Sequence, residues 1–129
     1  MENKRKVVLI IEDETPLLDS YSEILSSAGF DTLGASDGYK GMKVLSENKD
    51  SVDLVLLDLM MPGIDGLEVL RNFASKLGVY GEKPVIVLTA MVSDQVIKEA
   101  YELGAKSYLI KSELNSDELV NEIKRVLSS

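Results

Sequence analysis

The stretch Leu54-Val55-Leu56-Leu57-Asp58 sets four consecutive apolar residues directly before a carboxylate. A short apolar run of this kind is typical of a strand that is buried on both faces of a parallel sheet. Three other apolar runs also end at polar residues: residues 7–11 before Glu12-Asp13, residues 85–88 before Thr89, and residues 108–110 before Lys111. Because open α/β sheets bind ligands beyond the carboxyl ends of their strands, we expect these polar side chains to converge at one edge.

Helical segments alternate with the predicted strands, beginning after the first one. Thr15 followed by Pro16 predicts a helix start in which Thr15 is the cap. Gly29 predicts the end of that helix. Residues 31–35 then form a weaker strand candidate, which completes a strand-helix-strand unit.

Capping residues mark the later helices. A second helix follows Ser36-Asp37-Gly38, although Gly41 lowers its helix propensity. Residues 78–84, which precede the fourth strand, form the longest predicted loop. The starts of the last three helices are predicted from Asp65 paired with Glu68, from Ser93, and from Asn115 paired with Glu118. The chain thus alternates five strands with five helices.

This alternation predicts an α/β fold. Right-handed crossovers place helices on both faces of a parallel sheet, and the strand order 2-1-3-4-5 is a common solution. We predict a single doubly wound (βα)5 flavodoxin-like domain over residues 1–129, with its core in residues 6–127. No internal repeat, low-complexity tract or proline-rich linker divides the sequence.

The composition narrows the functional classes. The formal net charge of -8 argues against direct binding of nucleic acid or of an anionic membrane surface. The apolar runs are far shorter than the roughly 20 residues of a membrane-spanning helix, so we expect a cytoplasmic protein. The sequence contains no Cys and no His. A bound metal should therefore be a hard cation with oxygen ligands.

The polar residues at the strand ends suggest a metal site. Glu12, Asp13 and Asp58 would place three carboxylates at the ends of two adjacent strands, where like charges repel. Mg²⁺ accepts carboxylate, water and phosphate oxygens, so a magnesium site is the functional interpretation. Solvated loop acids are the alternative, but Thr89 and Lys111 at equivalent strand ends favour the magnesium site.

The same edge carries groups suited to phosphoryl chemistry. Lys111 can neutralise a bound anion, and Thr89 can donate a hydrogen bond to it. A carboxylate can attack phosphorus to give an aspartyl-phosphate, and Asp58, central in the predicted sheet, is the candidate nucleophile. Taken singly, Thr89 could be only a helix cap and Lys111 only a surface charge.

Over residues 6 to 127 the chain resembles the response-regulator receiver domains of two-component regulatory systems, the CheY-like superfamily. The resemblance rests on Glu12-Asp13, on Asp58-Leu59-Met60-Met61-Pro62-Gly63-Ile64-Asp65-Gly66, on Thr89-Ala90 and on Tyr108-Leu109-Ile110-Lys111, in the family's order and spacing. It implies a phosphoprotein that accepts a phosphoryl group on Asp58. The donor would be a phosphohistidine in a sensor histidine kinase or a histidine phosphotransfer protein.

The resemblance also implies a Mg²⁺ site. Asp13, Asp58 and the backbone carbonyl of Met60 would ligate the ion, with Glu12 helping directly or through water. Mn²⁺ could replace Mg²⁺.

The remaining roles that the resemblance implies concern binding of the phosphoryl group and the response to it. Thr89 and Lys111 would bind the phosphoryl oxygens, and Tyr108 would change rotamer as Thr89 moves toward them. The switched surface, formed by the fourth helix, the fifth strand and the last helix, would bind a downstream protein. Ordinary packing is the alternative role for Tyr108.

Two features depart from the family pattern or refine it. The family usually has Pro after the lysine, often with a cis bond, whereas Ser112 follows Lys111 here. Because a cis bond before a residue other than proline costs roughly 2.5–4 kcal/mol, we expect a trans bond. Met60 and Met91 flank the expected site and cannot hydrogen-bond an attacking water, which suggests a long-lived aspartyl-phosphate. Gap-filling is the alternative role for both.

Three functional classes follow from the sequence. The first is a phosphorylation-controlled signalling module that catalyses only its own phosphorylation and dephosphorylation, either free-standing or part of a larger protein. The second is a phosphatase that passes through an aspartyl-phosphate, although Met60 occupies the position where a second acid would support it. The third is a pseudo-receiver scaffold that never accepts phosphate.

Overall fold

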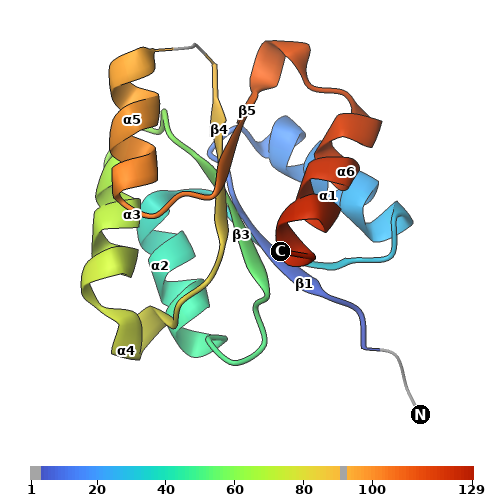
Figure 1. The fold of residues 1–129 in the computed structure, drawn as a ribbon. Helices are drawn as coiled ribbons and strands as arrows, with labels where there is room; N and C mark the ends of the chain where they lie inside the picture. The colour runs from blue at the N-terminus through green and yellow to red at the C-terminus, as the bar shows by residue number, and fades with distance from the viewer. Residues whose placement is uncertain (1–3, 91–92) are drawn as a thin grey trace.

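The computed structural model describes residues 4–90 and 93–129 and contains one parallel sheet (Figure 1). Its strand order is β2-β1-β3-β4-β5, so the predicted order is confirmed. The strands are β1 (Val7–Ile11), β2 (Asp31–Ala35), β3 (Leu54–Asp58), β4 (Val85–Thr89) and β5 (Ser107–Ile110).

Helices cover both faces of the sheet, as the alternating pattern predicts (Figure 1). One face carries α1 (Thr15–Ser27) and α6 (Ser116–Leu127). The other face carries α2 (Gly38–Glu47), α3 (Gly66–Ser75) and α5 (Asp94–Glu102), with the short α4 (Leu77–Tyr80) at the lower end of that layer.

Alternate residues of each central strand point into two separate apolar layers. In β3, Val55 and Leu57 pack toward α2 and α3, while Leu54 and Leu56 pack toward α1 and α6. All four are completely buried. Both faces of the strand therefore lie in apolar surroundings, which explains why its sequence is continuously apolar rather than alternating.

Three predicted helix caps, at Asp65, Ser93 and Asn115, are present, and Asp37 also caps α2. The side chains of Asp37, Asp65, Ser93 and Asn115 each accept a hydrogen bond from the backbone N–H three residues later. The prediction for Thr15 was wrong by one residue, because Glu14 is the N-cap and its side chain makes no capping bond. The carbonyl of Glu14 already accepts a hydrogen bond from Leu18 N, so the first helical turn includes Thr15.

The segment predicted as the longest loop contains a sixth helix. Helix α4 overlaps the start of residues 78–84, and its last residue, Tyr80, is buried against Phe73 of α3 with the ring centroids 5.0 Å apart. Gly81 then ends the helix with a φ of 75°. The tertiary contact of Tyr80, which the local sequence does not reveal, stabilises a turn too short to form alone.

No helix in residues 4–90 and 93–129 is both long enough and apolar enough to span a bilayer.

Gly66 allows α3 to start directly beneath the end of β3. A Cβ atom at this position would lie 2.6 Å from both the Asp58 carbonyl oxygen and Leu59 Cα. Both atoms belong to the backbone, so a side-chain rotation cannot relieve the clash.

We therefore expect Gly66→Ala to lower the free energy of unfolding by about 1–3 kcal/mol, the usual cost of overpacking. Urea unfolding followed by circular dichroism measures it. Gly78→Ala is the matched control, because a Cβ atom added to this α4 glycine would have no atom within 4 Å and should cost no stability. Equal stability of both variants would contradict the close-approach explanation.

Candidate functional site

Three carboxylates meet at the carboxyl edge of the sheet. Glu12 and Asp13 follow β1, and Asp58 ends β3, which pairs directly with β1. One carboxylate oxygen from each of the three residues lies within 4.8 Å of the other two. The predicted convergence of these acids is therefore present, with Glu12 and Asp58 buried and Asp13 partly exposed.

The Lys111 ammonium reaches into this cluster from the end of β5. Its Nζ lies 2.7 Å from Glu12 Oε1 and 3.1 Å from Asp58 Oδ2. Since β4 separates β5 from β3, the lysine side chain extends past the end of one strand to reach the carboxylate of the next. Three carboxylates and one ammonium leave a formal charge of about -2 at the cluster if all are ionised, which matches a divalent cation.

The protonation of Glu12 depends on its surroundings. Burial and the neighbouring Asp58 raise the pKa of Glu12 to about 7, against the opposing influence of Lys111. Lys111 Nζ forms an ion pair with Glu12 Oε1, and this oxygen has no other hydrogen-bond partner among the described residues. A buried carboxylate oxygen with a single ammonium neighbour keeps a lone pair that can bind a metal ion, so Glu12 Oε1 is a suitable ligand for a hard cation.

Lys111 remains charged in this setting. Burial lowers the pKa of the Lys111 amine, but the hydrogen bond to Glu12 and the charge of Asp58 raise it further, and the net change is upward. The ammonium is therefore a fixed positive charge beside Asp58. It also lies 3.5 Å from Glu14 Oε2, a contact that the sequence did not predict although Glu14 directly follows the acidic pair.

The backbone beyond Asp58 is held close to its carboxylate. Met60 N donates a hydrogen bond of 3.1 Å to Asp58 Oδ1, and Gly66 N donates one of 3.0 Å to Leu59 O. The Met60 side chain is 60% exposed. Asp58 therefore has one oxygen near Lys111 and the other near a backbone N–H, which fixes the orientation of the carboxylate.

Thr89 and Tyr108 lie on the two strands beyond β3. Thr89 is buried at the carboxyl end of β4, one residue after the register partner of Asp58. Tyr108 lies in β5 opposite Val87 and is 36% exposed. Its ring meets Tyr101 of α5 edge-on, with the centroids 6.3 Å apart. Met91, the other methionine singled out in the sequence, lies outside the described residues.

The segment after Lys111 differs from the cis-proline turn usual in the family. The described residues contain no cis peptide bond, so the expected trans Lys111-Ser112 bond is confirmed. A short 3-10 helix over Lys111–Glu113 follows β5 directly. Lys111 reaches both Glu12 and Asp58 with this geometry, so the missing proline does not misdirect its side chain.

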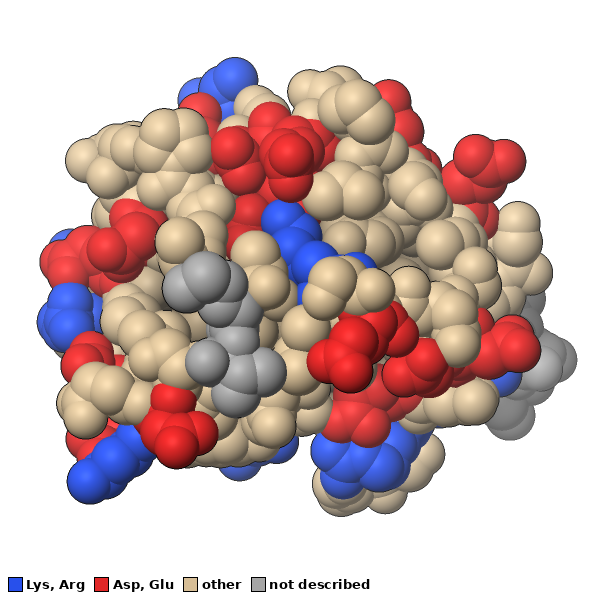
Figure 2. Space-filling model, turned by 90° about the horizontal axis from the view of Figure 1, so that it is seen from above, with Lys and Arg blue, Asp and Glu red and all other residues tan. Residues whose placement is uncertain are grey.

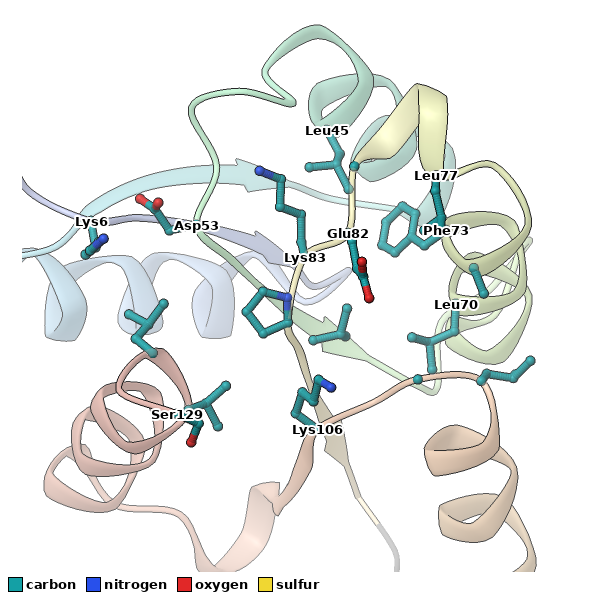
Figure 3. Close-up of a pocket in the computed structure, with 18 of the residues that line it drawn as sticks. Lys6, Leu45, Asp53, Leu70, Phe73, Leu77, Glu82, Lys83, Lys106 and Ser129 are labelled. Atoms are coloured by element: carbon teal, nitrogen blue, oxygen red, sulfur yellow. The ribbon is translucent and has the colours of Figure 1, made fainter.

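The surface around the site is acidic. Seen from above, a basic group lies near the centre of this face, with acidic side chains directly above it and to its lower right (Figure 2). A hollow of about 910 Å³ lies instead at the opposite edge of the sheet, where Lys6, Asp53, Pro84 and Lys106 precede the strands (Figure 3). The chemically distinctive groups therefore do not line this hollow.

Comparisons with known proteins agree with the site geometry. The family model of the response regulator receiver domain matches residues 8–124. The chain is 33% identical over 111 residues to the DNA-binding response regulator MtrA of Mycobacterium bovis, covering 86% of this chain and 46% of MtrA. It is 38% identical over 120 residues to the transcriptional regulatory protein CpxR of Klebsiella pneumoniae, covering 93% of this chain and 48% of CpxR. The chain thus spans about half the length of these curated relatives.

A solved structure with the same fold comes from Borrelia burgdorferi. The CheX-CheY-BeF3-Mg complex aligns with a TM-score of 0.84 at 25% identity, covering 94% of this chain and 88% of that chain. The family model matches most of the sequence, and the strand order and the carboxylates at the strand ends agree with that match. The chain belongs to the response regulator receiver domain family.

Proposed function

We propose that residues 1–129 form one receiver domain that accepts a phosphoryl group on Asp58 in a Mg²⁺-dependent reaction. The observation that carries this proposal is the contact of Lys111 Nζ with Asp58 Oδ2 at 3.1 Å, inside a cluster of three carboxylates. A nucleophilic carboxylate, a fixed ammonium and oxygen ligands for a divalent cation are the groups that phosphoryl transfer requires.

The residues present fit a magnesium ion. Asp13, Asp58 and the Met60 carbonyl would hold it, with Glu12 as a further or water-mediated ligand. When bound, the ion would neutralise charge on the transferring phosphoryl group. The Borrelia structure is a complex with Mg²⁺ and BeF3, and this supports the same chemistry in this chain.

The chemical step uses an oxygen of Asp58 as the nucleophile. This oxygen forms a bond to phosphorus while the phosphorus–nitrogen bond of a partner's phosphohistidine breaks, and the imidazole leaves with the bonding electrons. Lys111 would move its ammonium from Asp58 to a phosphoryl oxygen, and the Thr89 hydroxyl would donate to another. The partner would be a sensor histidine kinase or a histidine phosphotransfer protein.

Phosphorylation would then change a protein-binding face formed by α5, β5 and α6. Tyr108 already contacts Tyr101 across this face, so a rotamer change at Tyr108 would alter the exposed aromatic surface. The downstream target would be a protein in the cytoplasm. Direct DNA binding by this segment is not proposed, although MtrA as a whole is named a DNA-binding regulator.

Phosphorylation of Asp58 is tested with a small phosphodonor. Incubation with Mg²⁺ and acetyl phosphate should add one phosphate to the intact mass, because acetyl phosphate supplies an activated phosphoryl group. The gain should disappear in Asp58→Asn and when EDTA removes the metal. Absence of any gain would favour the pseudo-receiver scaffold, and continuous hydrolysis of small phosphate esters would favour the phosphatase.

The raised pKa of Glu12 predicts a pH dependence of stability without metal. The pKa is about 7 in the folded state and 4.5 in the ordinary state, so the folded protein binds the proton more tightly. The stability that this proton contributes is complete below about pH 4.5 and is lost as the pH rises through about 7.

Urea unfolding at several pH values should therefore show a loss on the order of 3 kcal/mol between pH 5 and pH 8 that Glu12→Gln lacks. Mg²⁺ should restore stability to the unaltered protein above pH 7, because the cation compensates the ionised carboxylate. Parallel pH profiles for the two proteins would contradict the assignment.

The exposed Met60 predicts a slowly hydrolysed aspartyl-phosphate. Its side chain cannot hydrogen-bond a water molecule, so nothing at this position would orient the attack on phosphorus. After removal of acetyl phosphate, intact mass should show the phosphate in Mg²⁺ for minutes or longer. Met60→Asn should shorten this lifetime because its amide can hold a water. Loss within seconds in the unaltered protein would refute the prediction.

A further inference from the structure

Helix α2 supplies none of the candidate ligands, yet it lies directly against both segments that carry them. Its buried face consists of Gly38, Gly41 and Leu45, which are spaced to lie on one side of the helix. The two glycines lack side chains, so other residues pack against the backbone of the helix itself. Glycine is a poor helix former, and its presence here needs an explanation from packing.

Gly41 is in close contact with the end of β1. A Cβ atom on Gly41 would lie 2.4 Å from Ile11 Cδ1, 2.7 Å from Cγ1 and 3.1 Å from Cγ2. Ile11 is completely buried and β-branched, so its side chain has little freedom to rotate away. The position of α2 therefore limits where the last residue of β1 can lie, and Glu12 and Asp13 follow immediately.

Gly38 makes the corresponding contact with the segment after Asp58. A Cβ atom on Gly38 would lie 2.5 Å from Ile64 Cγ2 and 2.7 Å from Val69 Cγ2. Ile64 lies between β3 and α3, in the segment that also contains Met60. The buried face of α2 thus contacts both the end of β1 and the segment after Asp58.

The packing of α2 against Ile11 matters for metal binding because Glu12, a candidate ligand, is the next residue. Its carboxylate is fully buried, Oε2 accepts a hydrogen bond of 3.3 Å from Glu14 N, and Oε1 lies 2.7 Å from Lys111 Nζ. The Glu12 backbone is held by a hydrogen bond from its N–H to Ala35 O of 3.0 Å. The position of the Glu12 carboxylate therefore depends on its contacts with Glu14 N and Lys111 Nζ and also on the backbone at the end of β1, which the packing against Ile11 holds in place.

We infer that α2 is a positioning element for Mg²⁺: Gly41, acting through Ile11, sets the position of Glu12 and Asp13, and Gly38, acting through Ile64, supports the segment after Asp58. This inference rests on the proposed function, since it concerns the same magnesium site. Neither glycine touches a ligand atom, so both are positioning residues.

The test is calorimetric titration of the metal-free protein with Mg²⁺ at pH 8. Gly41→Ala should weaken Mg²⁺ binding by about tenfold or more, as is usual when the support of a metal ligand is removed. Gly78→Ala is the matched control in another helix with open space around it, and its affinity should be unchanged. Unfolding in urea without metal is measured in parallel, because a purely structural role would change stability and leave the affinity of the folded protein intact.

A second substitution at Ile11 distinguishes loss of the Gly41–Ile11 contact from general disruption of the fold. Ile11→Val removes Cδ1, the atom nearest the added methyl group, so the double variant Gly41→Ala/Ile11→Val conserves volume. It should recover part of the lost Mg²⁺ affinity, because the nearest atom is gone while Cγ1, 2.7 Å from the added Cβ atom, must still shift. Ile11→Val alone should bind a few-fold more weakly because it leaves a gap. This opposite sign in the two backgrounds is the coupling expected of a complementary pair.

Two outcomes overturn the inference alone: Mg²⁺ affinity that is unchanged in Gly41→Ala, or a double variant as weak as the single one. If Gly41→Ala does not fold, unchanged affinity in both Ile11→Val and the double variant has the same meaning. Absence of Mg²⁺ binding to the unaltered protein would overturn the inference and the proposed function together. The titration therefore separates the failure of one from the failure of both.

Discussion

The Lys111 ammonium, held between Glu12 Oε1 and Asp58 Oδ2, is the interaction that organises the whole site. Without it, buried carboxylates from adjacent strands would face one another with no compensating charge. The compensation is incomplete, because one ammonium cannot balance three acids. Burial and the neighbouring Asp58 raise the pKa of Glu12 despite Lys111, so the ammonium does not fully offset the cost of the buried negative charge. A divalent ion at this point would relieve it.

The parallel sheet makes this arrangement possible. Strand order 2-1-3-4-5 puts β1 beside β3, so Glu12 and Asp13 meet Asp58 without any long loop. The order also puts β5 two strands away from β3, and only a side chain as long as lysine reaches across. Both faces of the central strands are closed by apolar layers. Water therefore reaches the acids mainly from the carboxyl edge, which is where a phosphoryl donor would have to approach.

The sheet and the position of the site could be predicted from the sequence because apolar runs mark where the strands end. Apolar runs that stop at Asp58, Thr89 and Lys111 reveal both the sheet and the edge where these residues lie. Features that depend on tertiary contacts were not predictable. Helix α4 forms because Tyr80 packs against Phe73, and the contact of Lys111 with Glu14 depends on the path of two separate loops. Gly41 looked only like a weak point in a helix, whereas its close approach to Ile11 explains it.

The acids of β1 and β3 should hold a divalent cation beside the phosphoacceptor, and every proposed role at this edge depends on that ion. Crystals of the protein soaked in Mn²⁺, which is visible by its anomalous scattering, would reveal it. We expect one strong anomalous peak bounded by the carboxylates of Asp13 and Asp58 and by the Met60 carbonyl, with Glu12 in contact directly or through water. Ordered crystals with no peak at this position, or with Mn²⁺ bound only elsewhere, would contradict the proposed site.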